Sequence, residues 1–189
     1  MKIEYITSNS HKFEEAKLIL SEWELEQINL DLTEIQGDRF KIVQAKAKEA
    51  FRILQRPLIV EDVSLCCSAI GGLPGPYIKD TLQKIGYKGL YELIHKYEDH
   101  TAQAICVAAY MKPGIEPLLF EGIVEGNIVA PKGKMPPNTM NFTPIFHPKG
   151  YKGTWGEMPL AERSKSSARS IALTKLKHFL ETSIEENFL

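Results

Sequence analysis

The chain has 189 residues, of which 43% are hydrophobic and 25% charged, and its formal net charge is −1. These values are typical of a soluble globular protein that forms one large domain or one domain with two lobes. The small net charge gives no electrostatic reason to expect nucleic acid or a membrane as a partner, and no apolar run is long enough to span a bilayer. Cys66, Cys67 and Cys106 form no C-x-x-C pair, so we expect buried, apolar, free thiols in a cytoplasmic protein.

Hydrophobic periodicity predicts strands that alternate with helices in the first part of the chain. The predicted strands cover residues 1–6, 25–30 and 58–61. Between the first two, Phe13, Ala16 and Leu20 recur at helical spacing. A second helix around residues 42–53 should stop before Pro57, because the residue before a proline disfavours helix.

The second part of the chain adds a strand pair and more helices. Two short helices are expected near 81–85 and 90–97, followed by strands at 102–111 and 118–126 with a turn at Pro113-Gly114. Residues 131–143 form a long irregular segment, and long loops in compact domains are often functional. A last helix covers about 167–180. Together the elements predict an α/β fold with a mixed sheet.

The strand at 58–61 ends in two carboxylates, Glu61 and Asp62. Sites in α/β sheets open at the carboxyl ends of strands, so these acids indicate a site, although acids are also common at solvated strand ends. The glycine- and proline-rich run at 71–79 that follows can bring backbone close to a ligand or form a rigid surface turn.

Two further groups point to phosphate chemistry. Residues Thr7-Ser8-Asn9-Ser10-His11-Lys12 lie between a strand and a helix, where backbone N–H groups and the positive helix end suit phosphate; an ordinary helix cap by Ser or Asn is the alternative. Glu34, Glu61 and Asp62 supply the hard oxygen ligands that Mg²⁺ prefers.

These segments closely resemble the inosine triphosphate pyrophosphatase family, whose Gly-Gly-Leu-Pro-Gly-Pro-Tyr-Ile-Lys stretch stands unchanged at 71–79. Members of that family hydrolyse purine nucleoside triphosphates with aberrant bases to the monophosphate and pyrophosphate. The resemblance runs from Ile3 to about Phe179. It implies a single α/β domain over 1–189, with a mixed central sheet flanked by helices and two lobes with an active-site cleft between them. It also implies Mg²⁺ as cofactor, a nucleoside triphosphate as partner, and a homodimer with residues 72–78 near the shared surface.

The resemblance also assigns roles to residues. Asp62 matches the catalytic aspartate that activates water, with Glu61 and Lys12 in the same site. Glu34 matches the metal-binding glutamate, which acts with Asp62 or Glu61. Lys46 matches a lysine near the phosphates, although a surface position is the usual fate of a helical lysine. The triphosphate is expected to contact Thr7, Ser8, Asn9, Lys12 and Lys46, and Ser8 replaces a family glycine.

The region expected to read the base departs from the family. Met140-Asn141-Phe142-Thr143-Pro144 replaces Phe-Gly-Trp-Asp-Pro, Ser167-Ala168-Arg169 replaces Ser-His-Arg, and Arg163 replaces a lysine. We expect Phe142 to stack on the base, Thr143, Arg163 and Ser167 to bind the substrate, and Arg169 to favour a base carbonyl. These replacements have two interpretations. The one we favour is an enzyme with altered base choice whose phosphate-cleaving residues are intact; the other is a degraded site with little activity. A specialised non-inosine substrate and a nucleotide-binding module with little turnover remain alternatives.

Overall fold

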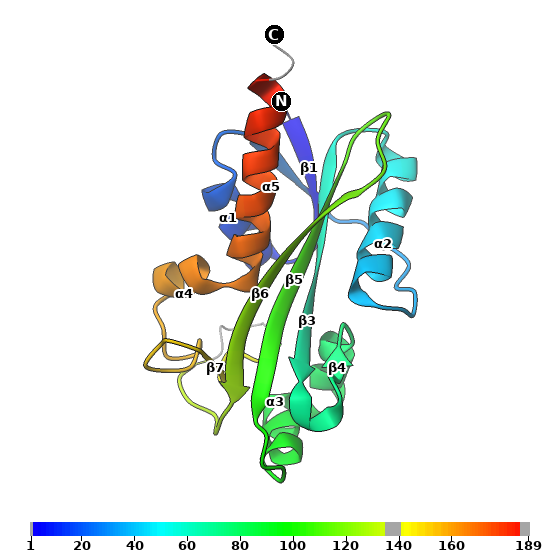
Figure 1. The fold of residues 1–189 in the computed structure, drawn as a ribbon. Helices are drawn as coiled ribbons and strands as arrows, with labels where there is room; N and C mark the ends of the chain where they lie inside the picture. The colour runs from blue at the N-terminus through cyan, green and yellow to red at the C-terminus, as the bar shows by residue number, and fades with distance from the viewer. Residues whose placement is uncertain (1, 135–140, 186–189) are drawn as a thin grey trace. The chain divides into compact units, whose positions relative to one another are not determined.

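The computed structural model describes residues 2–134 and 141–185, with strands and helices in the order shown in Figure 1. The elements are β1 (Lys2–Ile6), α1 (Ser10–Ile19), β2 (Glu24–Ile28), α2 (Arg39–Leu54), β3 (Leu58–Cys67), a 3₁₀ turn (Ser68–Ile70), β4 (Pro74–Gly75), α3 (Ile78–Ile94), β5 (Thr101–Met111), β6 (Leu118–Ile128), β7 (Phe146–Pro148), α4 (Leu160–Ser166) and α5 (Ala168–Glu185). No helix in the described part of the chain has the length and apolar character needed to cross a membrane.

The strands form one mixed sheet in the order β2-β1-β3-β5-β6-β7, with β4 paired to β3. β1 runs parallel to both β2 and β3. β4 pairs with β3, and β7 with β6, in antiparallel fashion. Parallel neighbours need a crossover, and α1 and α2 supply the crossovers from β1 to β2 and from β2 to β3. The predicted α/β fold with a mixed sheet is therefore confirmed.

The chain divides into two compact units. Unit 1 comprises residues 1–62, 106–122 and 168–189, and unit 2 comprises residues 63–105 and 123–167. Three of the boundaries between the units fall inside long strands, since β3, β5 and β6 each contribute residues to both units.

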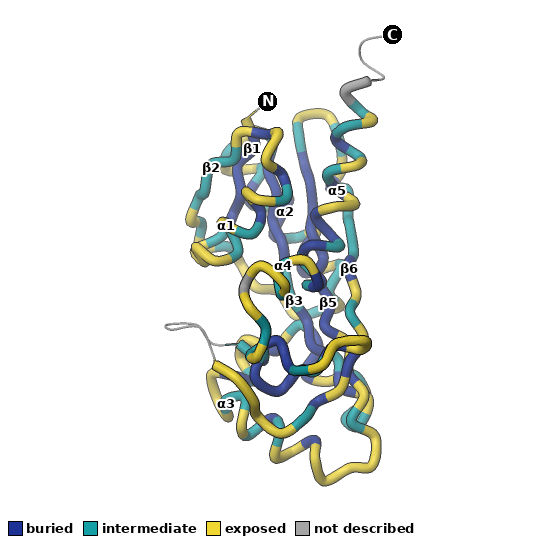
Figure 2. Tube along the Cα trace, turned by 90° about the vertical axis from the view of Figure 1, so that its left-hand side faces the viewer, coloured by how far each residue is buried: buried dark blue, intermediate teal, exposed yellow. Residues whose placement is uncertain are grey.

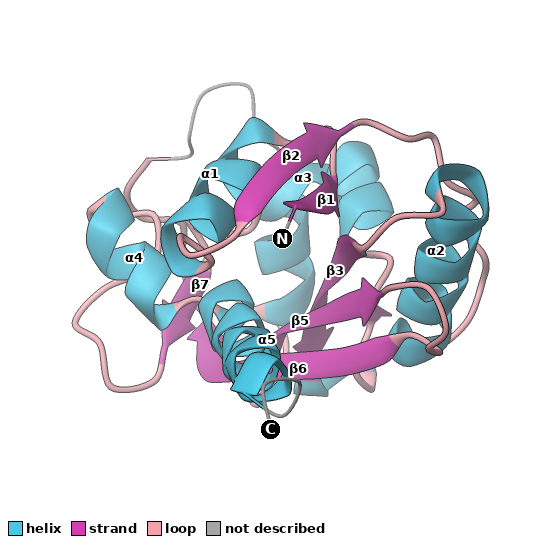
Figure 3. Ribbon diagram, turned by 90° about the horizontal axis from the view of Figure 1, so that it is seen from above, coloured by secondary structure: helices cyan, strands magenta, loops and turns pink. Residues whose placement is uncertain are grey.

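Unit 1 is an α/β sandwich in which α1 and α5 lie on one side of the strands and α2 on the other (Figures 1 and 3). The central strand β1 is buried on both faces, as Figure 2 shows, and only its first residue is exposed. Ile3 and Tyr5 of β1, Val43 and Ala47 of α2, and Ala172 of α5 are fully buried. This packing makes the carboxyl end of β1 and the middle of β3, where Glu61 and Asp62 lie, rigid supports for polar side chains.

The close approach of β6 and α5 in unit 1 depends on Gly122. A Cβ atom at this position would lie 2.0 Å from the carbonyl oxygen of Ala168 and 2.7 Å from the amide nitrogen of Ala172. Both atoms belong to backbone, which cannot move aside as a side chain can. Gly122→Ala is therefore expected to destabilise the protein by about 1–3 kcal/mol or more through overpacking, measured by urea unfolding. Gly37→Ala is the matched control, since its Cβ would meet only Lys41 side-chain carbons at 3.5 Å or more. Equal stability of the two variants would contradict the packing argument.

Unit 2 has its own core. Buried residues of β3, α3, β5, β6 and the 142–155 region pack together: Leu65, Cys67, Ile78, Leu82, Leu90, Ile94, Ala102, Ala104, Ile128, Phe142, Ile145, Phe146 and Trp155. Three aromatic rings form its centre, with ring centroids of Phe146 and Trp155 4.5 Å apart and Phe142 6.0 and 6.2 Å from them.

Several predicted elements differ from the structure. β3 continues to Cys67 instead of ending at Glu61, because Val63, Leu65 and Cys67 alternate with polar positions and extend the strand past its acids. The two short helices predicted at 81–85 and 90–97 correspond to α3, Ile78–Ile94, in which non-helical backbone at Gly86 (φ 66°, ψ 173°) separates two helical stretches. The break is confirmed, but the first helix begins earlier and the second ends earlier than predicted. Sequence analysis missed β4, β7 and α4, which are all short. The predicted strand pair at 102–111 and 118–126 and the last helix are confirmed with slightly longer bounds.

Candidate active site

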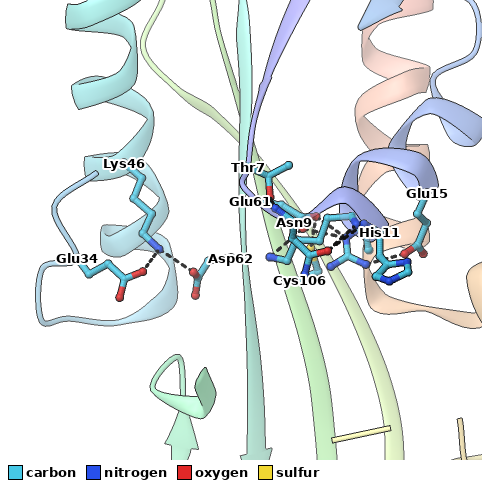
Figure 4. Close-up of polar contacts among 11 residues, drawn as sticks. Thr7, Asn9, His11, Glu15, Glu34, Lys46, Glu61, Asp62 and Cys106 are labelled. Atoms are coloured by element: carbon cyan, nitrogen blue, oxygen red, sulfur yellow. Dashed lines mark hydrogen bonds and ion pairs between the residues drawn. The ribbon is translucent and has the colours of Figure 1, made fainter. Parts of the chain in front are cut away.

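The polar residues predicted at the strand ends form two clusters in unit 1, one on each side of β3 (Figure 4). Glu61 and Asp62 are adjacent in the strand, so their side chains leave it in opposite directions. We name the two groups the Asp62 cluster (Glu34, Lys46 and Asp62) and the Glu61 cluster (Lys12, Glu15, Glu61, Cys106 and Arg169).

In the Asp62 cluster, two carboxylates converge on one ammonium group. Lys46 Nζ donates to Asp62 Oδ1 at 2.9 Å and to Glu34 Oε1 at 3.3 Å. Lys46 comes from the buried side of α2 and its side chain is only 11% exposed, so it is not the surface lysine that general statistics favour. Burial lowers the pKa of Lys46, but the charges of Asp62 and Glu34 outweigh that effect, so its net pKa is raised and the group stays charged.

The Glu61 cluster is built around a buried carboxylate. The Glu61 side chain is 1% exposed, and both of its oxygens accept from Arg169 Nε at 2.8 Å. Lys12 Nζ lies 3.1 Å from Glu61 Oε1, and the Cys106 thiol donates to Oε2 at 3.4 Å. Burial raises the pKa of Glu61, but Arg169 and then Lys12 more than offset it and lower the pKa to about 2. Glu61 is therefore an anion at neutral pH.

Arg169, at the start of α5, joins two carboxylates. Besides its contact with Glu61, its Nη1 donates to Glu15 Oε2 at 2.6 Å, and the side chains of both residues are largely buried. Burial opposes the charge of Arg169, but Glu61 and Glu15 raise its pKa well above the ordinary value. The guanidinium expected to read the base is thus held by carboxylates in this structure.

The loop after β1 is organised by its own side chains. Asn9 is the N-cap of α1 and its Oδ1 accepts from the amides of His11 and Lys12 at 3.0 and 3.3 Å. Thr7 Oγ1 accepts from the Asn9 amide at 3.1 Å, while Ser8 is exposed. The helix-cap alternative considered for this loop is therefore what the structure shows, and these three amides already have acceptors. Binding of phosphate to Thr7, Ser8, Asn9 and Lys12 stays a prediction.

The residues expected to read the base mostly lie in unit 2. Phe142 is 8% exposed and packs against Phe146 and Trp155, so its ring has a core role that the prediction of base stacking did not include. The Thr143 hydroxyl donates to Asn141 Oδ1 at 2.7 Å. Arg163 belongs to α4, Ser167 is the C-cap of that helix, and Met140 lies outside the described residues.

The donor set fits a divalent cation at the Asp62 cluster. Glu34 and Asp62 already share one positive charge, and Mg²⁺ is commonly bound by one or two carboxylates together with waters and substrate phosphates. Glu61 does not lie with this pair, because it points to the other side of β3 and is bound by Arg169 and Lys12. Of the two acids expected to act with Glu34, only Asp62 lies beside it in this structure, and binding of a metal ion stays a prediction. Within residues 2–134 and 141–185, no group of three or more His, Cys, Asp or Glu side chains is placed to hold a metal ion.

Sequence analysis missed Glu15 and misjudged two cysteines. Glu15 follows Lys12 by three residues in α1, a spacing that places both on one helix face, but nothing in the sequence links it to Arg169. Cys106 is buried as expected, yet it donates a hydrogen bond to Glu61 instead of acting as apolar filler. Cys66 is only half-buried.

Comparisons with known proteins agree with the fold. The Ham1 family model matches residues 3–179. The chain is 40% identical over 189 residues to the inosine triphosphate pyrophosphatase of Puccinia graminis f. sp. tritici, covering 95% of this chain and 97% of the relative. It is 42% identical over 179 residues to the enzyme of that name from Neurospora crassa, covering 94% and 91%. A HAM1 protein from Coxiella burnetii superposes with a TM-score of 0.85 at 25% identity, covering 96% of this chain and 99% of that one.

The mixed α/β sheet, with acidic and lysine side chains gathered beside β1 and β3, and the similarity to inosine triphosphate pyrophosphatases place the chain in a class of hydrolases that act on nucleoside triphosphates. Within that class, the chain belongs to the Ham1 family, because the family model and the relatives span nearly its whole length.

Proposed function

We propose that this protein is a nucleoside triphosphate pyrophosphohydrolase that acts on inosine triphosphate and related keto purine nucleotides such as dITP and XTP. It is a hydrolase of acid anhydrides that releases the nucleoside monophosphate and pyrophosphate. The observation that carries the proposal is the identity of about 40% over nearly the full chain to inosine triphosphate pyrophosphatases, with Asp62, Glu34 and Lys46 gathered at one point.

The chemistry assigned to this chain follows from its charges. Asp62 orients or deprotonates a water that attacks the α-phosphorus; the bond from the α-phosphorus to the bridging oxygen breaks, and pyrophosphate leaves. Lys12 and Lys46 pair with phosphate oxygens, together with Thr7, Ser8 and Asn9. Glu34 and Asp62 would hold Mg²⁺, which when bound neutralises phosphate charge and polarises the phosphoryl group.

Glu61 has a different task in this proposal. Its buried anion holds the cations of Lys12 and Arg169 in place, so it acts as a positioning residue for Lys12 instead of touching substrate. Base selection falls to Arg169 and to Phe142, Thr143, Arg163 and Ser167, where the chain departs from its family. Relaxed or altered base choice is therefore part of the proposal.

A panel of triphosphates tests the function. Inosine, deoxyinosine, xanthosine, guanosine and adenosine triphosphates are each incubated with the protein and Mg²⁺, and monophosphate and pyrophosphate are quantified. We expect monophosphate and pyrophosphate in equal amounts. Release should be faster from purines with a carbonyl group where Arg169 would donate a hydrogen bond than from adenosine triphosphate, which has an amino group there. A preference for a different base would support the specialised alternative, and binding without product would support a binding module and refute turnover.

We also propose a cytoplasmic homodimer. Three free cysteines fit a reducing compartment. In the 72–78 stretch that the family resemblance places near the shared surface, Leu73 and Tyr77 are 59% and 38% exposed, and exposed apolar side chains favour association. Sedimentation analysis of the purified chain measures its mass in solution.

A further inference from the structure

The Asp62 cluster holds a cation of its own. Lys46 Nζ lies 2.9 Å from Asp62 Oδ1 and 3.3 Å from Glu34 Oε1, so one ammonium bridges both carboxylates. These are the two acidic side chains that would hold a metal ion, and the lysine reaches them from α2 with 11% of its side chain exposed. Figure 4 shows the ammonium pointing between the two carboxylates.

The charges of this cluster decide when a divalent ion can join it. Two carboxylates and one ammonium sum to −1, and a divalent cation would bring the sum to +1. The Glu34 side chain is 52% exposed, but Lys46 and Asp62 are only 11% and 18% exposed, so a cation between them is repelled by the ammonium more than it would be in open water. Within the described residues no third His, Cys, Asp or Glu completes a metal site with this pair. A triphosphate brings several negative charges and further oxygen ligands for the metal. With the triphosphate present, the summed charge of the cluster and a divalent cation becomes negative, and the ammonium can contact a phosphate group.

We propose that Lys46 is the resident counter-ion of the Glu34–Asp62 pair and that it excludes free divalent cations until a polyphosphate draws it away. This inference rests on the proposed function, because it takes the nucleotide to be the anion that releases the lysine. The metal then enters with the nucleotide instead of waiting in the protein. Lys46 therefore has two states: it pairs with the Glu34 and Asp62 carboxylates before the nucleotide binds, and with a phosphate group afterwards.

Binding of Mn²⁺ to the nucleotide-free protein tests the proposal, with free Mn²⁺ followed by electron paramagnetic resonance. Wild type is expected to bind weakly. Lys46→Met removes the ammonium and should bind one Mn²⁺ per chain about tenfold more tightly or better, because the repelling charge is gone and the carboxylates remain. Lys48→Met is the matched control. Lys48 lies on the same helix, pairs with Glu116 at 2.6 Å and has 55% of its side chain exposed. The Lys48→Met variant therefore has the same net charge as Lys46→Met but an unchanged Asp62 cluster, and its affinity for Mn²⁺ should equal that of wild type.

A second readout covers the case in which the methionine variant folds poorly. Mn²⁺ alone should raise the melting temperature of Lys46→Met and of Lys46→Gln, but not that of wild type or Lys48→Met. Equal Mn²⁺ affinity of wild type and both Lys46 variants would overturn the proposal, and so would a gain in Lys48→Met as large as in Lys46→Met. The Mn²⁺ measurements contain no nucleotide, so they are independent of the test of turnover. If the Lys46 variants bind Mn²⁺ more tightly but the wild type turns over no triphosphate, only the proposed function is refuted. If the wild type turns over a triphosphate but the Lys46 variants bind Mn²⁺ no better than wild type, only this inference is refuted.

Discussion

Replacing Glu61 with glutamine is expected to lower the free energy of unfolding by about 3–5 kcal/mol, the range found when one partner of a buried ion pair is removed. Glu61 accepts from Arg169 at 2.8 Å and pairs with Lys12 at 3.1 Å while its side chain is 1% exposed. The amide has almost the same shape but no charge, so Lys12 loses its carboxylate and Arg169 keeps only Glu15. Urea unfolding followed by tryptophan fluorescence measures the loss.

The pH dependence of stability checks the same carboxylate in the wild type. Its pKa is about 2 in the folded protein, below the ordinary value of 4.5, so its contribution is complete above about pH 4.5 and is lost as the pH falls toward 2. A pKa that is lower by this amount corresponds to a contribution of about 3 kcal/mol to the free energy of unfolding. The fall in stability between these pH values should be shallower in Glu61→Gln, because the variant has no such group to protonate.

Glu26→Gln is the matched control for this effect. Glu26 also pairs with a lysine, Lys2, at 2.6 Å, but the two side chains are 45% and 44% exposed, and water and salt screen such exposed pairs so that they contribute little to stability. A loss in Glu61→Gln no greater than in Glu26→Gln would show that the buried network does not stabilise unit 1.

Local patterns in the sequence were sufficient for the strand that carries the acids, though not for its length. The run Leu58-Ile59-Val60 predicts a strand, and the period of two in a strand already requires Glu61 and Asp62 to face opposite sides. Treating the two carboxylates as one site ignored that rule, and the structure separates them into two clusters. The end of β3 was misplaced because two acids were interpreted as the end of a buried segment, whereas Leu65 and Cys67 are buried beyond them.

Long-range partners could not be read from the sequence. Arg169 is 154 residues from Glu15 and 108 from Glu61, and only the packing of α5 beside α1 brings them together (Figure 1). Family resemblance predicted that Arg169 reads the base, but it gave no reason to expect two carboxylates on that guanidinium. In the same way, an aromatic residue in an irregular segment is compatible with stacking on a ligand or with a core, and for Phe142 the neighbours Phe146 and Trp155 decide its burial.

Asp62→Asn is expected to reduce kcat for inosine triphosphate by about 100- to 10,000-fold, the range lost with a general base. The amide keeps the size of the side chain but cannot accept a proton from water. Binding of the nucleotide without Mg²⁺ should change little, because Lys12 and Lys46 keep their charges. Binding with Mg²⁺ should weaken, because the variant loses one of the two carboxylates proposed to hold the metal. Steady-state release of pyrophosphate measures kcat, and equilibrium binding of the unreacted nucleotide to the slow variant measures affinity.

The matched control is Asp80→Asn, which makes the same chemical change at an exposed aspartate in the first turn of α3, and its kcat should stay close to that of wild type. Melting temperatures of both variants separate a loss of chemistry from a loss of fold. Asp62 is 18% exposed and holds one side of the Lys46 ammonium, so a modest shift in stability is compatible with its role. Wild-type turnover in folded Asp62→Asn would instead exclude Asp62 as the base and would leave the Asp62 cluster with a function in binding alone.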